Sequence, residues 1–152
     1  MKPRIHATAG AVAMLCILSF WTSTAISELF LSHEAVVWVK QMILYGLWVL
    51  IPAMAITGGS GFSLASGRSG HFVEGKKRRM RFIALNGLVI MVPTAFFLFH
   101  KATAGEFDTV FYAVQAVELL VGIAQLFLMT INFRDGLVLA GRFRAPGPEL
   151  SD

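Results

Sequence analysis

The sequence predicts an all-α integral membrane protein in which four spanning helices form a bundle and a short interfacial helix follows the last span. Hydrophobic residues make up 56% of the 152 residues and charged residues only 14%, whereas about 25% of the residues in a soluble domain are charged. Four apolar segments each approach the roughly 20 residues that a helix needs to cross the hydrocarbon core. The basic residues behind the net charge of +4 flank these segments, so this charge indicates membrane topology rather than nucleic-acid binding.

The first two spans are predicted at residues 7–31 and 35–57. The basic start at residues 1–4 resembles that of a signal peptide, but the apolar run exceeds the usual length of about 7–15 residues and no small-residue cleavage site follows. We therefore expect an uncleaved helix. The connection at residues 32–34 is so short that the two spans should be antiparallel neighbours. The single cysteine, Cys16, excludes a disulfide within the chain and a metal site built from several cysteines.

The third and fourth spans are predicted at residues 82–101 and 108–132, after a long connection at residues 58–81. This connection begins with a glycine-rich run, which we interpret as a helix stop, and ends with a basic run. Pro93 predicts a kink in the third span. Residues 133–143 mix apolar and charged side chains, which favours a short interfacial helix.

The distribution of basic residues predicts the orientation of the chain. All but two of the 13 Lys and Arg residues, Lys40 and Lys101, fall on the side of the two termini and the long connection. The positive-inside rule then places both termini in the cytoplasm, and we expect a multi-pass protein of a bacterial inner membrane that contacts the lipid bilayer. Residues 1–144 form one domain, and residues 145–152 are predicted to be a flexible tail.

Polar side chains recur on one face of the predicted fourth span at spacings of three and four residues. Polar groups at membrane depth face protein or water rather than lipid. Glu118 is therefore either a neutral structural contact to another helix or, together with Gln115, a contact to a quinone head group or a proton relay. The full stripe is Gln115, Glu118, Gly122, Gln125, Met129 and Asn132. Similar spacings predict interior faces on the second and third spans, at Gln41, Tyr45, Trp48 and Pro52, and at Asn86, Ile90, Pro93, Phe97 and His100.

Two ionisable residues, Glu28 and Lys40, are predicted at similar depth near the junction of the first two spans. We expect them to form an ion pair beside His33. This pair either holds the two helices together or forms the charged rim of a ligand site.

Four histidines lie near the ends of the predicted spans, with His6 and His71 on the side of the termini and His33 and His100 on the opposite side. Neutral imidazole is a common axial ligand of haem iron. His33 and His100 form the better candidate pair because both lie beside short connections, whereas pairing His6 with His71 requires the long connection to fold back. The alternative is that all four are ordinary interfacial residues with amphipathic rings.

A short four-span bundle with histidines near both surfaces resembles the small four-helix membrane b-type cytochromes. The resemblance is architectural, covers the four-span region and implies haem b, with iron ligated by His33 and His100, and electron transport with a quinone. Two alternatives are a non-catalytic accessory subunit of a larger membrane complex and a small dimeric transporter, the latter favoured by Glu118 and by two proline-containing helices. The chain has no motif of a hydrolytic enzyme or of a phosphate-binding loop.

Overall fold

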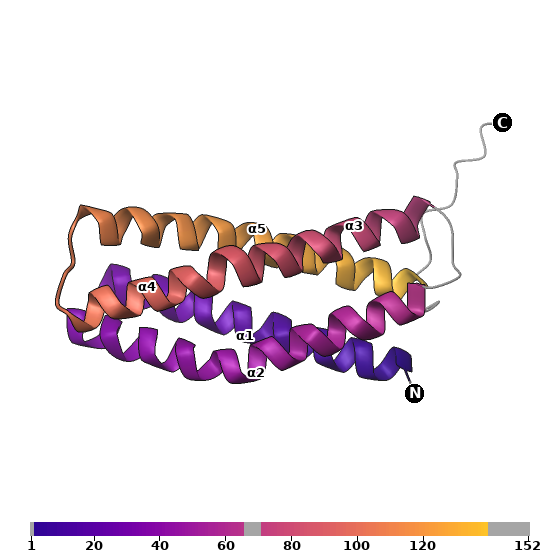
Figure 1. Ribbon diagram of the computed structural model, residues 1–152, viewed down its shortest axis with the longest axis horizontal. Coiled ribbons are helices and arrows are strands. Elements are labelled where there is room, and N and C mark those ends of the chain that lie inside the picture. Colours follow the sequence, from indigo (N-terminus) through magenta and orange to yellow (C-terminus); the bar gives the residue numbers. More distant parts are fainter. Residues whose placement is uncertain (1, 66–70, 140–152) are drawn as a thin grey trace.

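The computed structural model describes residues 2–65 and 71–139, and this part of the chain is helical except at its turns. Its elements are α1 (Lys2–Phe30), α2 (His33–Ala65), α3 (His71–Asn86), the π-helix η1 (Gly87–Met91), α4 (Val92–Thr103) and α5 (Thr109–Leu139). Because α3, η1 and α4 follow one another without a break, the chain forms four long helical rods (Figure 1). Among the described residues, four helices are long and apolar enough to cross a membrane, which confirms the prediction of an all-α fold with four helices able to span.

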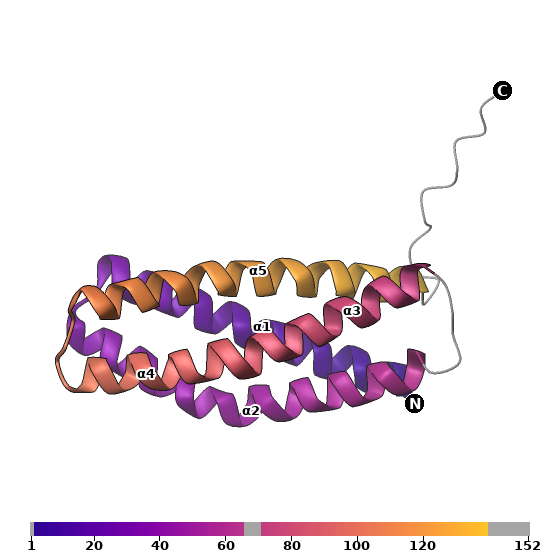
Figure 2. The ribbon, with the colours of Figure 1, turned by 45° about the horizontal axis from the view of Figure 1, so that its top comes forward.

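Two antiparallel hairpins make up the bundle (Figures 1 and 2). In one hairpin α1 packs along α2, and in the other the α3–η1–α4 rod runs beside α5. Both hairpin turns, residues 31–32 and 104–108, lie at the same end of the bundle, which we call the turn end. The start of α1, the end of α2 and the start of α3 lie at the opposite end, which we call the terminal end.

Local chemistry determines the second turn. Gly105 has a φ of 73°, a left-handed conformation that strains every residue except glycine. Three residues later, Asp108 Oδ1 accepts a hydrogen bond from the backbone N–H of Phe111 at 2.9 Å. Asp108 therefore caps the first turn of α5.

The buried face of α2 differs from the predicted one. The exposed side chains include Tyr45, Pro52 and Trp48, whose exposed fraction is 83%, while Ile43, Leu47, Leu50 and Ala53 are buried. The predicted face of the third span is also wrong, because Ile90, Pro93, Phe97 and His100 are exposed. Asn86, by contrast, is partly buried and donates to Gln125 of α5. In a segment that is apolar on all sides, periodicity does not distinguish the lipid face from the protein face, and aromatic rings suit lipid contact.

The glycine-rich run at residues 58–61 does not end α2, which continues to Ala65. Tertiary contacts explain the difference. His6 Nδ1 donates to the carbonyl oxygen of Thr57 at 3.0 Å, and Gly61 is buried where the His6 ring approaches α2. Packing against α1 thus offsets the propensity cost of about 1 kcal/mol that each glycine adds to a helix.

The segment before the third span and the segment after the fourth span are also helical, and each extends the span beside it. α3 begins at His71, so the basic run before the third span is helix rather than loop. α5 continues to Leu139, so residues 133–139 extend the last span and do not form a separate interfacial helix. Residues 140–152, which include the predicted flexible tail, lie outside the described residues.

The predicted disturbance at Pro93 takes the form of a π-helix. The N–H of Val92 donates to the carbonyl oxygen of Gly87, five residues earlier, instead of four. Pro93 has no backbone N–H, so it cannot donate a hydrogen bond to a carbonyl group in the preceding turn. The π-turn just before it changes which carbonyl groups of that turn are left without a donor. π-turns are frequent at functional sites, and this one borders a cavity.

Candidate functional site

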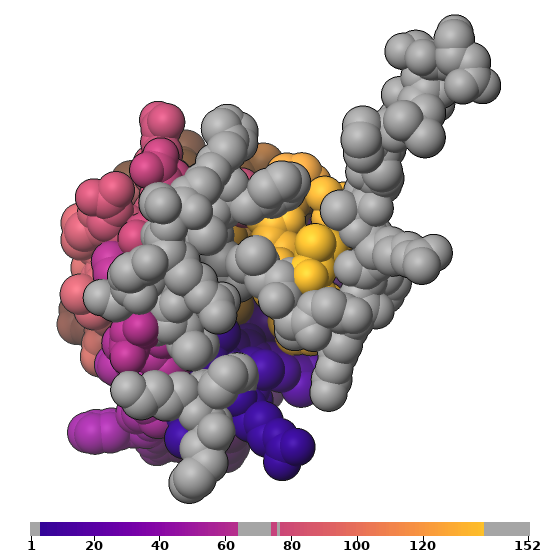
Figure 3. All heavy atoms as spheres, turned by 90° about the vertical axis from the view of Figure 1, so that its right-hand side faces the viewer, coloured from indigo at the N-terminus to yellow at the C-terminus, as the bar shows by residue number. Residues whose placement is uncertain are grey.

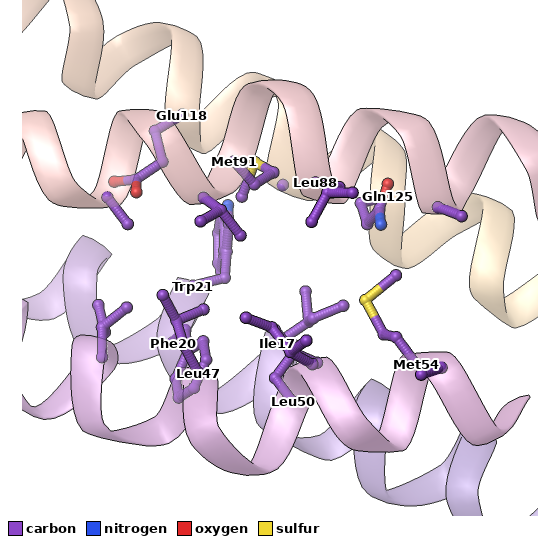
Figure 4. A pocket seen from close by; sticks show the side chains of 18 of the residues that line it. Ile17, Phe20, Trp21, Leu47, Leu50, Met54, Leu88, Met91, Glu118 and Gln125 are labelled. Atoms are coloured by element: carbon purple, nitrogen blue, oxygen red, sulfur yellow. The ribbon is translucent and has the colours of Figure 1, made fainter. Parts of the chain in front are cut away.

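A cavity of about 450 Å³ lies between the two hairpins, at the middle of the bundle. Its wall is almost entirely apolar, and Figure 4 shows residues of α1 and α2 facing those of η1 and α5 across an open space. The polar exceptions are Thr24, Glu118 and Gln125. Glu118 and Gln125 are seven residues apart, about 10 Å along α5, so the cavity runs lengthwise between two polar groups.

From the exposure of the lining residues we infer that the cavity opens sideways between α2 and the α3–η1 segment. The lining residues with large exposed side chains are on these two elements, namely Ile51 and Phe62 on α2 and Leu88 on η1. The lining residues on α5 are buried or partly buried. The flank of a spanning helix faces hydrocarbon, so this opening is suited to a molecule that arrives through the lipid.

A buried ionic cluster borders the cavity on the side of the turn end. Lys40, with an exposed fraction of 1%, donates through Nζ to Glu118 Oε2 at 2.9 Å and to the side-chain oxygen of Gln115. Gln115 Nε2 also donates to Glu118 Oε2, at 3.0 Å. Both α5 residues are buried, with exposed fractions of 3% and 8%. The carboxylate of Glu118 thus carries a fixed set of donors while it also forms part of the cavity wall.

Lys40 therefore pairs with Glu118 across the bundle, whereas the sequence predicted a pair with Glu28. Glu28 interacts electrostatically with Lys40, Glu118 and His33. However, its Oε1 atom is buried and has no hydrogen-bond partner among the described residues. Lys40 pairs with Glu118 because it lies deeper in the bundle than Glu28 does. At that depth it meets Gln115 and Glu118 of α5.

The opposite end of the cavity is bordered by an amide cluster. Gln125 donates to the carbonyl oxygen of Ile83 at 3.0 Å and accepts from Asn86 Nδ2 at 2.8 Å. The side chain of Gln125 therefore joins α5 to α3 immediately before the π-helix. In an α-helix the carbonyl oxygen of Ile83 accepts a hydrogen bond from the backbone N–H four residues later. The bond from Gln125 is a second one to the same oxygen, and it anchors α3 where the helix geometry changes.

Trp21 lies between the two polar ends of the cavity (Figure 4). Its Nε1 donates to the carbonyl oxygen of Leu119 at 3.0 Å. A Cβ atom added to Gly122 would lie only 2.8 Å from the Trp21 ring, so glycine at this position lets the indole pack against α5. Together these contacts confirm that the predicted polar stripe of α5 faces the other helices.

The stripe continues to the terminal end, which Figure 3 views directly. Arg79 Nε donates to Asn132 Oδ1 at 3.0 Å, and its guanidinium also pairs with the buried carboxylate of Asp135. These contacts tie α3 to α5 on the far side of Gln125. We assign them a structural role because they lie outside the cavity wall.

The structure places the four histidines at two ends of the bundle. His33 is the first residue of α2 and stacks on Phe107, with ring centroids 3.9 Å apart. His100 is an exposed residue in the last turn of α4. His6 contacts α2, and His71 begins α3, although its side chain is outside the described residues.

The described contacts do not bring His33 and His100 together around a shared space. The stack on Phe107 leaves the His33 ring nitrogens at the ring edge, and no described contact joins them to His100. None of the described residues that line the cavity is a histidine. Among the described residues there is also no group of three or more His, Cys, Asp or Glu side chains close enough to hold a metal ion. The cavity and the histidines are therefore separate features of this fold.

Sequence reasoning did not find the cavity or the partner of Lys40. The spacing on α5 indicated the interior position of Gln115 and Glu118, but no sequence signal gave the registry between α2 and α5. In comparisons with known proteins, no family model, no curated protein and no solved structure matches the chain. The site itself is therefore the basis for a functional assignment.

Proposed function

We propose that this chain binds a lipid-soluble molecule of the quinone class in the cavity between its two hairpins. The observation that carries this proposal is the combination of an apolar chamber, open to lipid, with the buried cluster of Lys40, Gln115 and Glu118 at one side. Binding sites for such molecules are mostly apolar and contain a few fixed polar groups that orient the ligand.

The two parts of the ligand match two parts of the wall. An isoprenoid or alkyl tail would lie against Ile51, Phe62 and Leu88 at the lateral opening, where the side chains are apolar and partly exposed. The oxygenated ring would lie toward Glu118, whose carboxylate can accept a hydrogen bond from a quinol hydroxyl. Because this carboxylate is already held by Lys40 and Gln115, it is oriented before any ligand arrives.

Three predictions from the sequence form part of this proposal: a quinone as partner, a bacterial inner membrane as location and termini in the cytoplasm. Quinones dissolve in the hydrocarbon of the bacterial inner membrane, where we expect this chain to lie with both termini in the cytoplasm. Ligation of haem b by His33 and His100 remains a separate prediction, and a reduced-minus-oxidised spectrum of the purified protein tests it. The cavity supports the quinone part of the predicted function, and it does so without involving the histidines.

Tryptophan fluorescence tests the proposal because one tryptophan lines the cavity. Replacement of the exposed residues Trp38 and Trp48 by Phe leaves Trp21 as the reporter. Titration of this variant in detergent with decylubiquinone should give saturable quenching. An equal amount of dodecane, which has no ring or oxygen atom, is the control for nonspecific partitioning.

A variant that fills the cavity gives the decisive comparison. A Cβ atom on Gly58 meets no atom within 4 Å, and Gly58 lines the cavity, so Gly58→Leu places a side chain in the chamber without a clash at Cβ. We expect its affinity for decylubiquinone to fall at least about tenfold, equivalent to about 1.4 kcal/mol. Ala116→Leu, which adds the same side chain on the exposed face of α5, should bind as the parent does. Quenching that does not saturate, or equal affinities for both variants, would overturn the proposal.

A further inference from the structure

Three ionisable side chains form a graded series from the turn end toward the cavity. Glu28 is two residues from the end of α1, Lys40 is seven residues into α2, and Glu118 is nine residues into α5. At 1.5 Å per residue these positions lie about 3, 10 and 14 Å from the turn end. The first member is partly exposed and the last lines the cavity, so the series extends from near the surface of the turn end to the chamber.

The contacts within the series leave one position unfilled. Lys40 uses its ammonium group on Glu118 and Gln115, and Gln115 donates a second bond to Glu118. By contrast, Glu28 Oε1 is buried and has no hydrogen-bond partner among the described residues. The neighbouring Ser27 hydroxyl donates to the carbonyl oxygen of Thr24 instead. A buried carboxylate oxygen without a donor is costly, and a proton on this group lowers that cost because it removes the charge.

The charges of the series lead to the same conclusion. Two carboxyl groups, Glu28 and Glu118, share one ammonium group, Lys40, and the other ionisable group that acts on Glu28 is the exposed His33 of α2. With both carboxyls ionised and His33 neutral, the cluster would carry an uncompensated negative charge in a poorly polarisable interior. A single bound proton makes it neutral.

We propose that Glu28 and Glu118 share one proton across Lys40, and that this cluster exchanges protons between the cavity and the water at the turn end. In each transfer the O–H bond of Glu118 breaks and an O–H bond forms on Glu28, which then releases the proton to water. Lys40 stays an ammonium group and pairs with whichever carboxylate is ionised. Where this rests on the proposed function, the O–H bond of a bound quinol breaks, an O–H bond forms on Glu118 and the quinol is left as its quinolate anion, with no change of oxidation state. The shared proton itself needs no ligand.

Infrared spectroscopy of the ligand-free protein in membranes tests the shared proton. A protonated carboxylic acid has a carbonyl stretching band that a carboxylate lacks. We expect this band at neutral pH in the native protein, with the intensity of one group. Both Glu28→Gln and Glu118→Gln should abolish it, because each leaves one carboxylate for one ammonium group and no proton is then required.

Controls make every outcome decisive. Glu34→Gln removes an exposed carboxyl from the first turn of α2 and should leave the band unchanged, and circular dichroism verifies that each variant keeps its helices. Absence of the band in the native protein overturns the proposal. Survival of the band in either Glu28→Gln or Glu118→Gln also overturns it, because the proton would then belong to one group alone. As no ligand is present, failure here is distinct from failure to bind decylubiquinone.

Discussion

Lys40→Met removes the ammonium group that joins α2 to α5, and its effect on stability is predictable in size and in pH dependence. Lys40 has an exposed fraction of 1% and donates to two side chains of α5. Removal of one partner of a buried ion pair costs about 3–5 kcal/mol, because the other charge stays buried without compensation. Protonation limits this cost, since holding an ordinary glutamic acid protonated at pH 7 takes about 4 kcal/mol.

Because protonation of the unpaired carboxyl limits the loss, the stability of Lys40→Met should depend on pH. The free energy of unfolding of Lys40→Met should recover by about 1.4 kcal/mol for each pH unit of acidification, because the carboxyl left behind is easier to protonate at lower pH. The measurement is unfolding in mixed micelles, followed by circular dichroism. The double variant Lys40→Met/Glu118→Gln should be more stable than Lys40→Met, since replacement of both charges removes the unpaired group.

A half-buried lysine at the surface of the turn end supplies the matched control. Lys101 pairs with Asp108 and Glu106 at the surface of the turn end, where ion pairs contribute little, so Lys101→Met should have a small effect. The reasoning is refuted if Lys40→Met destabilises the protein no more than Lys101→Met does. It is equally refuted if the double variant loses the sum of the two single losses.

Two further predictions concern glycine packing and the cap of α5. A Cβ atom at Gly46 would overlap the ring of Phe20, so Gly46→Ala should destabilise the protein by about 1–3 kcal/mol. The matched control Gly59→Ala places its methyl group in open space and should be neutral or stabilising by up to about 1 kcal/mol. Both variants are measured by unfolding in mixed micelles, and equal effects would contradict the close approach of Phe20 to Gly46. Two hydrogen bonds, from Lys101 and from the backbone N–H of Phe111, lower the pKa of the Asp108 carboxyl below its ordinary value of 3.8. The ionised Asp108 cap therefore stabilises α5 fully above pH 3.8, and this stabilisation is lost as the pH falls through the lowered pKa. The protection factor for amide hydrogen exchange in the first turn of α5, which compares the intrinsic rate with the measured rate at the same pH, should therefore fall on acidification in the native protein. Asp108→Asn should remove this acid-induced fall, and an unchanged fall in that variant would show that another group causes it.

The sequence predicted the spans well because each depends on a run of apolar residues and on its own length. Span ends were less accurate. The glycine-rich run at residues 58–61 has a strong local preference to end a helix, but the contact from His6 to Thr57 continues α2 beyond it. Likewise, the pair formed by Arg79 and Asp135 holds together two segments that composition alone indicated as a loop and an interfacial helix.

The candidate site was predicted in part. The spacing of Gln115 and Glu118 placed both residues inside the bundle, because the period of a helix is a local property. Their partner Lys40 was assigned to Glu28 instead. That assignment considered depth within one hairpin, whereas the observed contact depends on how the two hairpins pack.

The sequence by itself determined that this chain is a bundle of four apolar helices, that one face of α5 is polar and that most basic residues lie at one end. These properties follow from composition, length and helical period, which require no knowledge of neighbouring helices. Only the tertiary structure decided which faces of α2 and α3 meet protein, where the cavity lies and how Lys40, Glu118 and Glu28 are arranged. Nearly uniform apolar helices can pack in several registers with similar burial, so the registry is determined by a few contacts between residues far apart in the chain.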